Sequence, residues 1–469
     1  MDFGFGPDVR TIVVCPSISF PAAELRKITG NTFYEERMLY LLLLLEDPAT
    51  RVVYLTSEAI DPDIVDYYLG FLPDPDEARR RLDLLALDDP EERALSLKLL
   101  DRPDVVAELA EVVGDPARAF LFPFNVTSWE ARLCERLRLS LYGAPVETRA
   151  LGSKSGARRL ARAVGVEILE GVEDLWSVAE TEAAVDAVLA ARPEAPGVVI
   201  KLNDGFSGQG NAILAREDVR SPLSSSHTVF CAAGESWESF EPKIAAGGAV
   251  VEEMLRSSDG SSPSVQMRVA PSGRTEMVST HAQVLGGPDD QVYLGCRFPA
   301  PAEHRAEITR RAERIGAALA ERGVVGPFGI DFLIAPSRDG ARVNLSEINL
   351  RVGGTTHPFA MAQLASGARY DAASGELLAR GRPLRYVATD NLVSSRYVGL
   401  RPKQVVDAIR ARGIAFERNE ATGITLHLLG ALTRHGKMGA TCIARTHEDA
   451  DALYGALVST VEELAGGPV

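Results

Sequence analysis

The sequence predicts a multidomain protein of mixed α/β and α+β class, with domain boundaries near residues 145 and 385. Its 469 residues are enough for two or three domains with hydrophobic cores of their own. Residues 1–145 alternate short apolar runs with helical patterns, which is typical of a parallel sheet flanked by helices. Residues 386–469 combine strand-like and helical segments in a small α+β module, and residues 146–385 form the block between them.

The N-terminal block is expected to begin with a strand-helix-strand-helix order. Strands are predicted where short apolar runs occur, at 10–15, 51–55 and 119–122. Helices are predicted at 33–45 and at 61–69, where Asp61 can cap the helix and Pro62 suits its first turn. The charged stretch 74–113 has a helical pattern, and a further helix is expected to open at Thr127 or Ser128. The C-terminal module is predicted to hold strands at 392–398, 423–429 and 439–444, and helices at 402–412 and from Glu448 onward.

Composition excludes several classes of protein. A net charge of −15 argues against a general nucleic-acid binder, whose contacts need clustered Lys and Arg. The five cysteines are scattered and form no CxxC, which fits a reducing compartment better than a disulfide framework or a thiolate zinc site. The apolar run 38–45 is too short to span a bilayer, and the N-terminus lacks the pattern of a signal peptide. We therefore expect a soluble cytoplasmic protein without a membrane partner.

Three oxygen-bearing side chains in the central block suit a metal site. Glu347 and Asn349 are two residues apart, so on a strand both point to the same face. Asp331 ends a similar apolar run, and a hairpin between the two runs would bring all three together. Hard oxygen ligands of this kind suit Mg²⁺, with Arg351 on the same face as a donor to phosphate or to developing carbonyl charge. The alternative is an ordinary polar strand end followed by a turn at Gly353-Gly354.

A second segment suits phosphate binding. Lys201 ends a short apolar strand and is followed by glycines at 205, 208 and 210, which allow backbone N–H groups to face phosphate oxygens. The pattern is neither a P-loop nor a dinucleotide fingerprint, and a glycine-rich hairpin turn is the alternative. Lys154 lies at the start of a predicted helix, where a lysine opposes the helix dipole unless an anion is near. A solvated lysine would explain it equally.

The remaining candidate residues lie on two stretches of predicted strand. The strand 249–255 ends in Glu252 and Glu253, which are either solvated or contact an adenine and its ribose. Three further residues on the alternating stretch that follows, Arg268, His281 and Arg297, are candidate catalytic groups, with His281 the candidate base for an amine. His281 could equally be a partly buried histidine whose hydrogen bonds are satisfied within the protein. No nucleophile elbow is present, so serine-hydrolase chemistry has no support.

The order of these segments resembles the ATP-grasp superfamily. A lysine at a helix start, a strand lysine with a glycine loop, an acidic strand, an aspartate, and then Glu-x-Asn-x-Arg-x-Gly-Gly follow one another over about half of the chain. The resemblance implies a two-subdomain ATP-grasp fold between an N-terminal pre-ATP-grasp domain and the C-terminal module. It also implies ATP as a substrate and two Mg²⁺ ions. By this resemblance the residues that contact the phosphates would be Lys154, Lys201 and the loop Gly205, Ser207, Gly208, Gln209 and Gly210; those lining the adenine would be Glu252, Glu253, Met254 and Leu255; and the metal ligands would be Asp331, Glu347 and Asn349, with Arg351 on the transferred phosphoryl group.

The flanking blocks look like those of the pheganomycin-type peptide ligases, over most of the length. The segments that carry this likeness are 391–397 and 422–427. It implies a ligase that joins the carboxylate of an unusual amino acid to a peptide amine through an acylphosphate, in peptide natural-product biosynthesis. One departure concerns D-alanine–D-alanine ligases, in which an arginine precedes the first metal aspartate by two positions; Gly329 stands there in this chain.

Two other functions remain open from the sequence. The acceptor could be a non-peptide amine, or the chain could be a nucleotide-binding regulatory protein without turnover. Small-molecule amino acid and peptide substrates are the expected partners, and the apolar strands of the C-terminal module could supply the surface of a homodimer.

Overall fold

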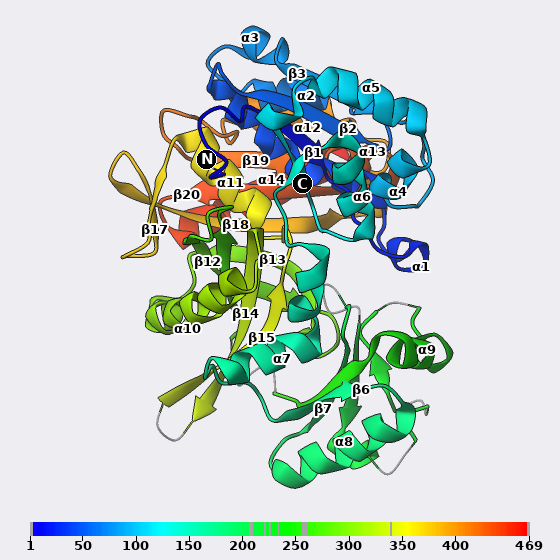
Figure 1. The fold of residues 1–469 in the computed structure, drawn as a ribbon. Coiled ribbons are helices and arrows are strands. Elements are labelled where there is room, and N and C mark those ends of the chain that lie inside the picture. Colours follow the sequence, from blue (N-terminus) through cyan, green and yellow to red (C-terminus); the bar gives the residue numbers. More distant parts are fainter. Residues whose placement is uncertain are drawn as a thin grey trace.

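The computed structural model describes residues 3–205, 210–219, 222–224, 227–232, 234–255, 261–337 and 340–466. Its mixed α/β and α+β architecture confirms the predicted class (Figure 1). The described residues form three sheets, of five, five and ten strands. No helix in this part of the chain is both long and apolar enough to cross a membrane.

The N-terminal sheet is parallel, as its strand-helix alternation predicts. Its strands are β1 (Thr11–Cys15), β2 (Arg51–Thr56), β3 (Leu82–Ala86), β4 (Ala119–Pro123) and β5 (Ser140–Leu141), in the order β3-β2-β1-β4-β5. Adjacent strands pair in parallel throughout. Helices α2 (Pro62–Leu69) and α6 (Ser128–Leu137) begin close to the predicted positions, and α5 (Pro103–Val113) lies within the stretch expected to be helical. Asp61 caps α2, and Thr127 with Glu130 forms a capping box on α6.

Two expectations for this block need correction. Residues 74–113 are not helical throughout, because strand β3 lies between the helices α3 (Pro75–Arg79) and α4 (Leu95–Leu100). The alternation of β3 is weak and its side chains are only partly buried, so its apolar pattern resembles that of a helix. The buried helix predicted at 33–45 is present, but as the 3₁₀ helix η1 (Asn31–Glu46).

The second sheet is antiparallel and lies at the far end of the molecule from both termini (Figure 1). Its order is β6-β10-β7-β8-β9, with β6 (Gly171–Leu175), β7 (Gly197–Leu202), β8 (Asn211–Ala215), β9 (Val229–Phe230) and β10 (Ala249–Glu253). Helices α8 (Val178–Ala191) and α9 (Trp237–Gly247) pack against it. Helix α7 (Lys154–Ala163) precedes this unit and contacts both β10 and β15.

The ten-stranded sheet joins the central and C-terminal blocks. Its path is β15-β14-β11-β12-β13-β18-β17-β16, and β20 pairs with both β18 and β19. The strands of the central block are β11 (Pro263–Val269), β12 (Thr275–Gly286), β13 (Val292–Phe298), β14 (Gly326–Ser337) and β15 (Gly340–Asn349). Those that complete it are β16 (Arg369–Asp371), β17 (Glu376–Ala379), β18 (Arg382–Val393), β19 (Gly423–His427) and β20 (Lys437–Ala444).

Strand β18 crosses the boundary predicted at 385. The strand expected at 392–398 is its end, since β18 stops at Val393 and a 3₁₀ turn follows at Ser395–Tyr397. Helices α10 (Ala302–Glu321), α11 (Thr356–Ser366), α12 (Pro402–Ala411), α13 (Gly430–His435) and α14 (His447–Leu464) complete the fold.

The first and last parts of the chain share one hydrophobic core. That core takes side chains from η1 and α2 together with side chains from α12, β19, β20 and α14. Figure 1 shows the same arrangement, with the blue N-terminal elements and the red C-terminal strands in one body. The Tyr67 hydroxyl accepts a hydrogen bond of 2.8 Å from the Leu426 N–H across this contact. The N-terminal block is therefore held against the end of the chain.

Candidate functional site

Two rows of residues cross the ten-stranded sheet at its β15 end. The first row runs across β15, β14 and β11 through Glu347, Asp331 and Ser264. The second row lies two residues further along β15 and runs through Asn349, Gly329 and Gln266. Directly opposed residues in an antiparallel sheet share a face. The hairpin of β14 and β15 therefore brings Asp331, Glu347 and Asn349 together, as expected from their spacing.

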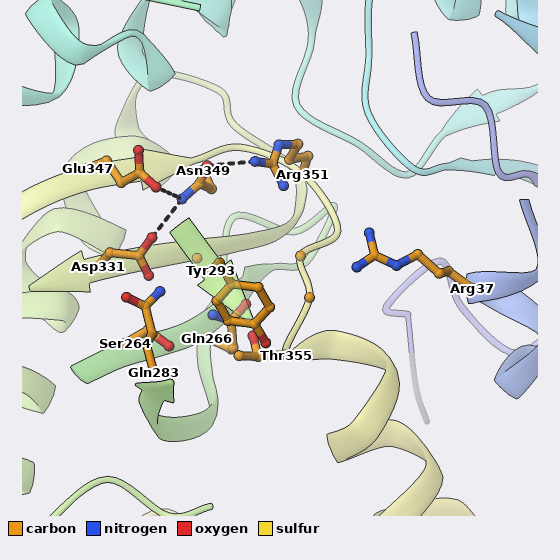
Figure 2. A pocket seen from close by; sticks show the side chains of 13 residues that line it. Arg37, Ser264, Gln266, Gln283, Tyr293, Asp331, Glu347, Asn349, Arg351 and Thr355 are labelled. Carbon is orange, nitrogen blue, oxygen red and sulfur yellow. Dashed lines mark hydrogen bonds between the residues drawn. The ribbon is translucent and has the colours of Figure 1, made fainter. Parts of the chain in front are cut away.

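The three predicted metal ligands are joined by hydrogen bonds. The Asn349 amide nitrogen donates to Asp331 Oδ2 and to Glu347 Oε1, at 3.0 Å in both cases. Arg351 donates in turn to Asn349 Oδ1 at 3.0 Å (Figure 2). Burial raises the pKa of Asp331 to about 6, although Lys154 and Arg351 oppose the shift. Lys154 and Arg351 thus offset only part of the cost of burying this carboxylate, and a cation would supply further positive charge.

The donor set fits a hard divalent cation. Two carboxylates and an amide face one space, and turning the Asn349 amide over would point its oxygen there, because the two ends of an amide are nearly equal in shape. In the part of the chain that the structure describes, no three His, Cys, Asp or Glu side chains gather as a metal site. A cation would therefore take Asn349, waters and substrate phosphates as its further ligands, which is the usual pattern for Mg²⁺.

The two predicted phosphate lysines are buried near these side chains. Lys154 is the first residue of α7 and is buried, with its ammonium group in contact with the Glu347 carboxylate. Burial, together with the charge of Lys201, lowers the pKa of Lys154 to about 7. Lys201 is the next-to-last residue of β7 and pairs with Glu252 at 2.6 Å. Two buried ammonium groups near one cavity are suited to an anion with several charges.

Asn203 fixes the start of α7, a role that the sequence did not indicate. Its side-chain oxygen accepts from the Ser155 N–H at 2.9 Å, and its amide nitrogen donates to the Gly247 carbonyl at 2.9 Å. Its backbone carbonyl accepts from the Lys154 N–H at 3.3 Å. The lysine, the loop after β7 and the end of α9 are thus tied together through one residue.

The ends of the glycine loop meet closely. A Cβ added to Gly205 would lie 3.1 Å from the Gly210 Cα, and the Gly210 carbonyl accepts from the Leu202 N–H at 2.9 Å. Glycine at both positions allows this approach of the two backbones. The predicted phosphate contacts Ser207, Gly208 and Gln209 lie outside the described residues.

The two acidic residues at the end of β10 form ion pairs with Arg and Lys side chains of the protein. Glu252 is buried and pairs with Arg158 at 2.5 Å as well as with Lys201. Glu253 points the other way: it accepts from the Glu170 N–H at 3.0 Å and lies 3.4 Å from Arg192.

The residues after this acidic pair have an apolar setting. Met254 is buried in a cluster with Val199, Ile213 and Cys231, and the following Leu255 is half-buried. The Met254 N–H donates to the Gly197 carbonyl at 3.0 Å, so its backbone donor is already in use. Glu252 thus orients Lys201 in this arrangement, and the predicted adenine contacts Met254 and Leu255 lie in apolar surroundings next to it.

Three predicted catalytic residues lie away from this cavity. Arg297 is partly exposed and forms a two-pronged pair with Asp451, at 2.8 and 3.0 Å. Arg268 pairs with Glu276 and lines a different cavity of about 350 Å³. His281 lies on the same sheet face as Gln283, but Phe298, Phe359 and Tyr386 surround it.

His281 is unsuited to act as a base in this arrangement. It is fully buried, its Nε2 lies 2.6 Å from the Tyr386 hydroxyl, and burial lowers its pKa to about 3. We therefore leave His281, Arg268 and Arg297 out of the proposed catalytic set.

One pocket residue comes from the N-terminal block, and its sequence context did not indicate it. Arg37 of η1 lines a cavity of about 90 Å³ beside the three acidic and amide side chains (Figure 2). The other side chains around it are polar, except for the ring of Tyr293. Gly329 matters here because a Cβ at this position would lie 2.9 Å from the Gln266 amide nitrogen. The glycine that replaces the arginine of D-alanine–D-alanine ligases therefore leaves room for Gln266.

A second cavity, of about 100 Å³, shares Asn349 and Arg351 with the first and also includes Lys154 and Gly205. It adjoins a larger cavity of about 500 Å³ between the N-terminal block and α9, with Phe20 and Asn203 common to both. The sheet face at Asn349 is thus bordered by cavities on two sides.

An ionic clasp of Glu24, Lys27, Glu235 and Lys243 lies at the edge of the large cavity. Lys27 is 2.6 Å from Glu235, and Lys243 is 2.9 Å from Glu24 and 2.7 Å from Glu235. Glu24 and Lys27 belong to the N-terminal block, whereas Glu235 and Lys243 belong to the unit of the second sheet. The clasp therefore joins these two parts of the chain.

Comparisons with known proteins agree on one family. A family model described as IQCH-like, ATP-grasp matches residues 220–369, and one described as PGM1 C-terminal domain matches residues 404–457. L-propargylglycine–L-glutamate ligase of Streptantibioticus cattleyicolor is 31% identical over 453 residues, covering 94% of this chain and 92% of that protein. IQ motif-containing protein H of Danio rerio is 20% identical over 76% of this chain, which spans 38% of that protein.

Solved structures share the fold at low identity. Biotin carboxylase from Campylobacter jejuni has a TM-score of 0.60 and 14% identity, over 98% of this chain and 95% of that one. L-amino acid ligase from Bacillus licheniformis has a TM-score of 0.53 and 14% identity, over 96% and 97%. These likenesses concern the fold alone.

Proposed function

The chain belongs to the ATP-grasp ligases, and on that premise we propose that it joins an amino acid carboxylate to a peptide amine through an acylphosphate. Its family relative from Streptantibioticus cattleyicolor is named for two amino acids, L-propargylglycine and L-glutamate. By analogy, the proposed donor is an amino acid, in the synthesis of a peptide natural product.

The proposed reaction has two steps. A carboxylate is a poor acyl donor because its leaving group would be oxide, so a carboxylate oxygen first attacks the γ-phosphorus of ATP and ADP leaves. A neutral amine then attacks the acyl carbon and forms the C–N bond. The tetrahedral intermediate loses a proton from its nitrogen and expels phosphate as the acyl C–O bond breaks. Neither step needs a protein nucleophile; both need reactants held in line and their charge neutralised.

Each part of the site has a proposed role in this sequence. The acid would occupy the cavity that includes Arg37, with its carboxyl group near Arg351. The phosphates would lie in the cavity that includes Lys154 and Gly205, with Lys201 beside them. The amine would approach through the large adjoining cavity.

Asp331, Glu347 and Asn349 are the proposed ligands of two Mg²⁺ ions. When bound, the ions would neutralise phosphate oxygens and withdraw charge from the transferred group. Arg351, which lies 3.0 Å from Asn349 Oδ1, is proposed to face the transferred phosphoryl group.

One observation carries the proposal: a carboxylate pair, an amide, Arg351 and Lys154 line two cavities that share a wall. Asn349 and Arg351 border both cavities, so a group activated on one side can be attacked from the other. A site that only bound a nucleotide would not need the second approach.

The test is acid-dependent ADP formation, with hydroxylamine to trap an acylphosphate as the hydroxamate. Glu347→Gln and Asn349→Ala are expected to fold normally and to lose at least about 100-fold in ADP release, because each removes a ligand from the phosphoryl-transfer site. Glu321→Gln and Asn419→Ala change the same residue types at exposed positions and serve as matched controls. Wild-type turnover in both site variants would remove the metal assignment. A wild-type protein that gives no hydroxamate with any acid would remove the proposed function.

A further inference from the structure

The cavity beside the metal face contains a second guanidinium whose role the proposed reaction does not require. Arg351 already lies next to Asn349, close to the proposed site of phosphoryl transfer. Arg37 enters from the opposite wall, as Figure 2 shows, and its side chain is only 15% exposed. Both belong to the lining of one small cavity. The role of Arg37 therefore depends on which group of a ligand it contacts in this cavity.

Arg37 is held from behind by elements that are distant in sequence. Its Nη2 atom donates to the Asp390 carboxylate of β18, and its Cζ atom lies 4.7 Å from the Tyr34 ring centroid. Asp390 is also 2.6 Å from Nε2 of the buried His427. The Arg37 carbonyl lies 2.9 Å from Nδ1 of His357. The side chain is thus fixed in one orientation by its surroundings.

This support uses only part of the guanidinium. Among the described residues, its single side-chain hydrogen bond is the one to Asp390. An arginine has five N–H donors, so a fork of donors remains for the cavity. Close packing keeps the support in place, since a Cβ on Gly439 would lie 2.1 Å from His427 Nε2. Arg37 is therefore held by Asp390 on one side, and its remaining N–H donors face the cavity.

The other walls of the cavity indicate a small polar ligand. Ser264 Oγ is buried and has no hydrogen-bond partner among the described residues. The amides of Gln266 and Gln283 also face the cavity, and the enclosed volume is about 90 Å³. An unpaired buried hydroxyl costs free energy unless a ligand satisfies it. Arg37 and Arg351 both line this cavity, so it favours an anion between the two guanidinium groups.

We infer that the donor acid has a second anionic group, and that Arg37 binds it while the reacting carboxyl group lies at the Arg351 end. A carboxylate matches the guanidinium fork best, so the donor class is a small dicarboxylic acid or an acidic amino acid. The inference rests on the proposed function and adds a substrate class to it. Asp390 acts as a positioning residue, because it touches Arg37 and not the cavity.

The test compares acids that differ by one charge at nearly constant shape. Glutamate with glutamine, aspartate with asparagine, and glutarate with glutaramate are assayed by hydroxamate trapping with wild type, Arg37→Met and Arg37→Lys. The wild type is expected to prefer the charged member of a pair. Arg37→Met is expected to raise KM for that acid by about 10- to 100-fold, the usual effect of losing a hydrogen bond to a charged group. Its effect on the uncharged analogue should stay within about threefold.

Arg434→Met is the matched control. Arg434 also lies over an aromatic ring of η1, with 5.4 Å to the Phe33 centroid, and it pairs with Glu58 at 2.7 Å. It does not line the cavity, so its substitution should leave the preference unchanged. Should Arg37→Met fail to fold, Arg37→Lys decides: a single ammonium cannot replace a two-pronged contact, so the preference must fall while the charge is kept.

Two results would overturn the inference, and they are distinguishable from failure of the proposed function. Hydroxamate formation without any preference for a second charge would remove it and leave the ligase activity standing. An equal rise of KM for both members of a pair in Arg37→Met would also remove it, since a general structural role predicts that result. Absence of hydroxamate with every acid in the wild type would remove both proposals together.

Discussion

Replacing Glu252 with glutamine is expected to destabilise the unit built on the second sheet by about 3 to 5 kcal/mol. Glu252 lies between two buried cations, 2.5 Å from Arg158 and 2.6 Å from Lys201, and all three side chains are less than one-tenth exposed. Arg158 in turn holds Glu173 at 3.0 Å and the Leu169 carbonyl at 3.2 Å. A neutral amide at 252 would leave two buried positive charges without their shared partner, which is the costly case for a buried ion pair.

The pH dependence has a definite sign. Burial by itself would raise the pKa of Glu252, but Lys201 and Arg158 lower it below its usual value of 4.5. A carboxyl group with a lowered folded-state pKa contributes stability above its unfolded-state pKa and loses it as the pH falls through the folded value. The difference in the free energy of unfolding between wild type and Glu252→Gln should therefore have its full value at pH 7 and shrink only below about pH 4.5.

The assay is urea unfolding followed by tryptophan fluorescence in a Trp129→Phe background, because Trp176 and Trp237 then report on the second sheet and its helices. Glu252→Gln, Arg158→Met and the double variant form a cycle, for which we expect a coupling energy of about 2 kcal/mol. Asp407→Asn, in an exposed pair with Lys403 at 2.6 Å, should cost less than about 1 kcal/mol. A loss below about 1 kcal/mol in Glu252→Gln, or additive single variants, would refute the reasoning.

Two further predictions concern nucleotide binding and the contact between the parts of the chain. Since burial lowers the pKa of Lys154 to about 7, nucleotide phosphates beside it should raise that pKa, and binding at pH 7.5 should take up about 0.7 proton. Calorimetry in buffers of different ionisation enthalpy measures this uptake, and the same uptake in Lys154→Met would contradict it. Glu235→Gln removes the shared acid of the ionic clasp, so amides of α9 should exchange hydrogen about tenfold faster than in wild type. Unchanged exchange in 0.05 and 0.5 M salt would show that the clasp does not hold the two parts together.

The sequence predicted best the residues that are brought together by contacts between neighbouring parts of the chain. Glu347 and Asn349 are alternate positions of one strand, and a hairpin of two adjacent strands brings Asp331 to them. Their convergence follows from the period of a strand and a short connection, without knowledge of the rest of the fold. The fold class was equally accessible, because strand-helix alternation specifies a parallel sheet.

The residues that the sequence did not predict depend on distant contacts. Arg37 stands between Glu36 and a run of apolar residues, and nothing in that context separates it from an ordinary surface arginine. Its place in the cavity arises because η1 packs on the C-terminal strands, and its partner Asp390 is 353 residues away. Glu252 was interpreted as a ligand contact for the same reason: its partner Arg158 lies 94 residues earlier. His281 and Arg297 fell on strands near the site, but aromatic rings pack around His281 and Arg297 is paired with Asp451, so neither reaches the cavity.

The strand that crosses the predicted domain boundary limits how such enzymes can be recombined. Strand β18 pairs with β13 on one side and with β20 on the other, and it also supplies Asp390, which holds Arg37. A chimera that took its last hundred or so residues from a relative would have to match the registers of β18 with β13 and with β20. It would also have to match the packing around Arg37, which lies in the N-terminal block. The first and last segments of this chain are therefore expected to change together in evolution, while the unit between them, joined through the clasp and α7, is free to vary on its own.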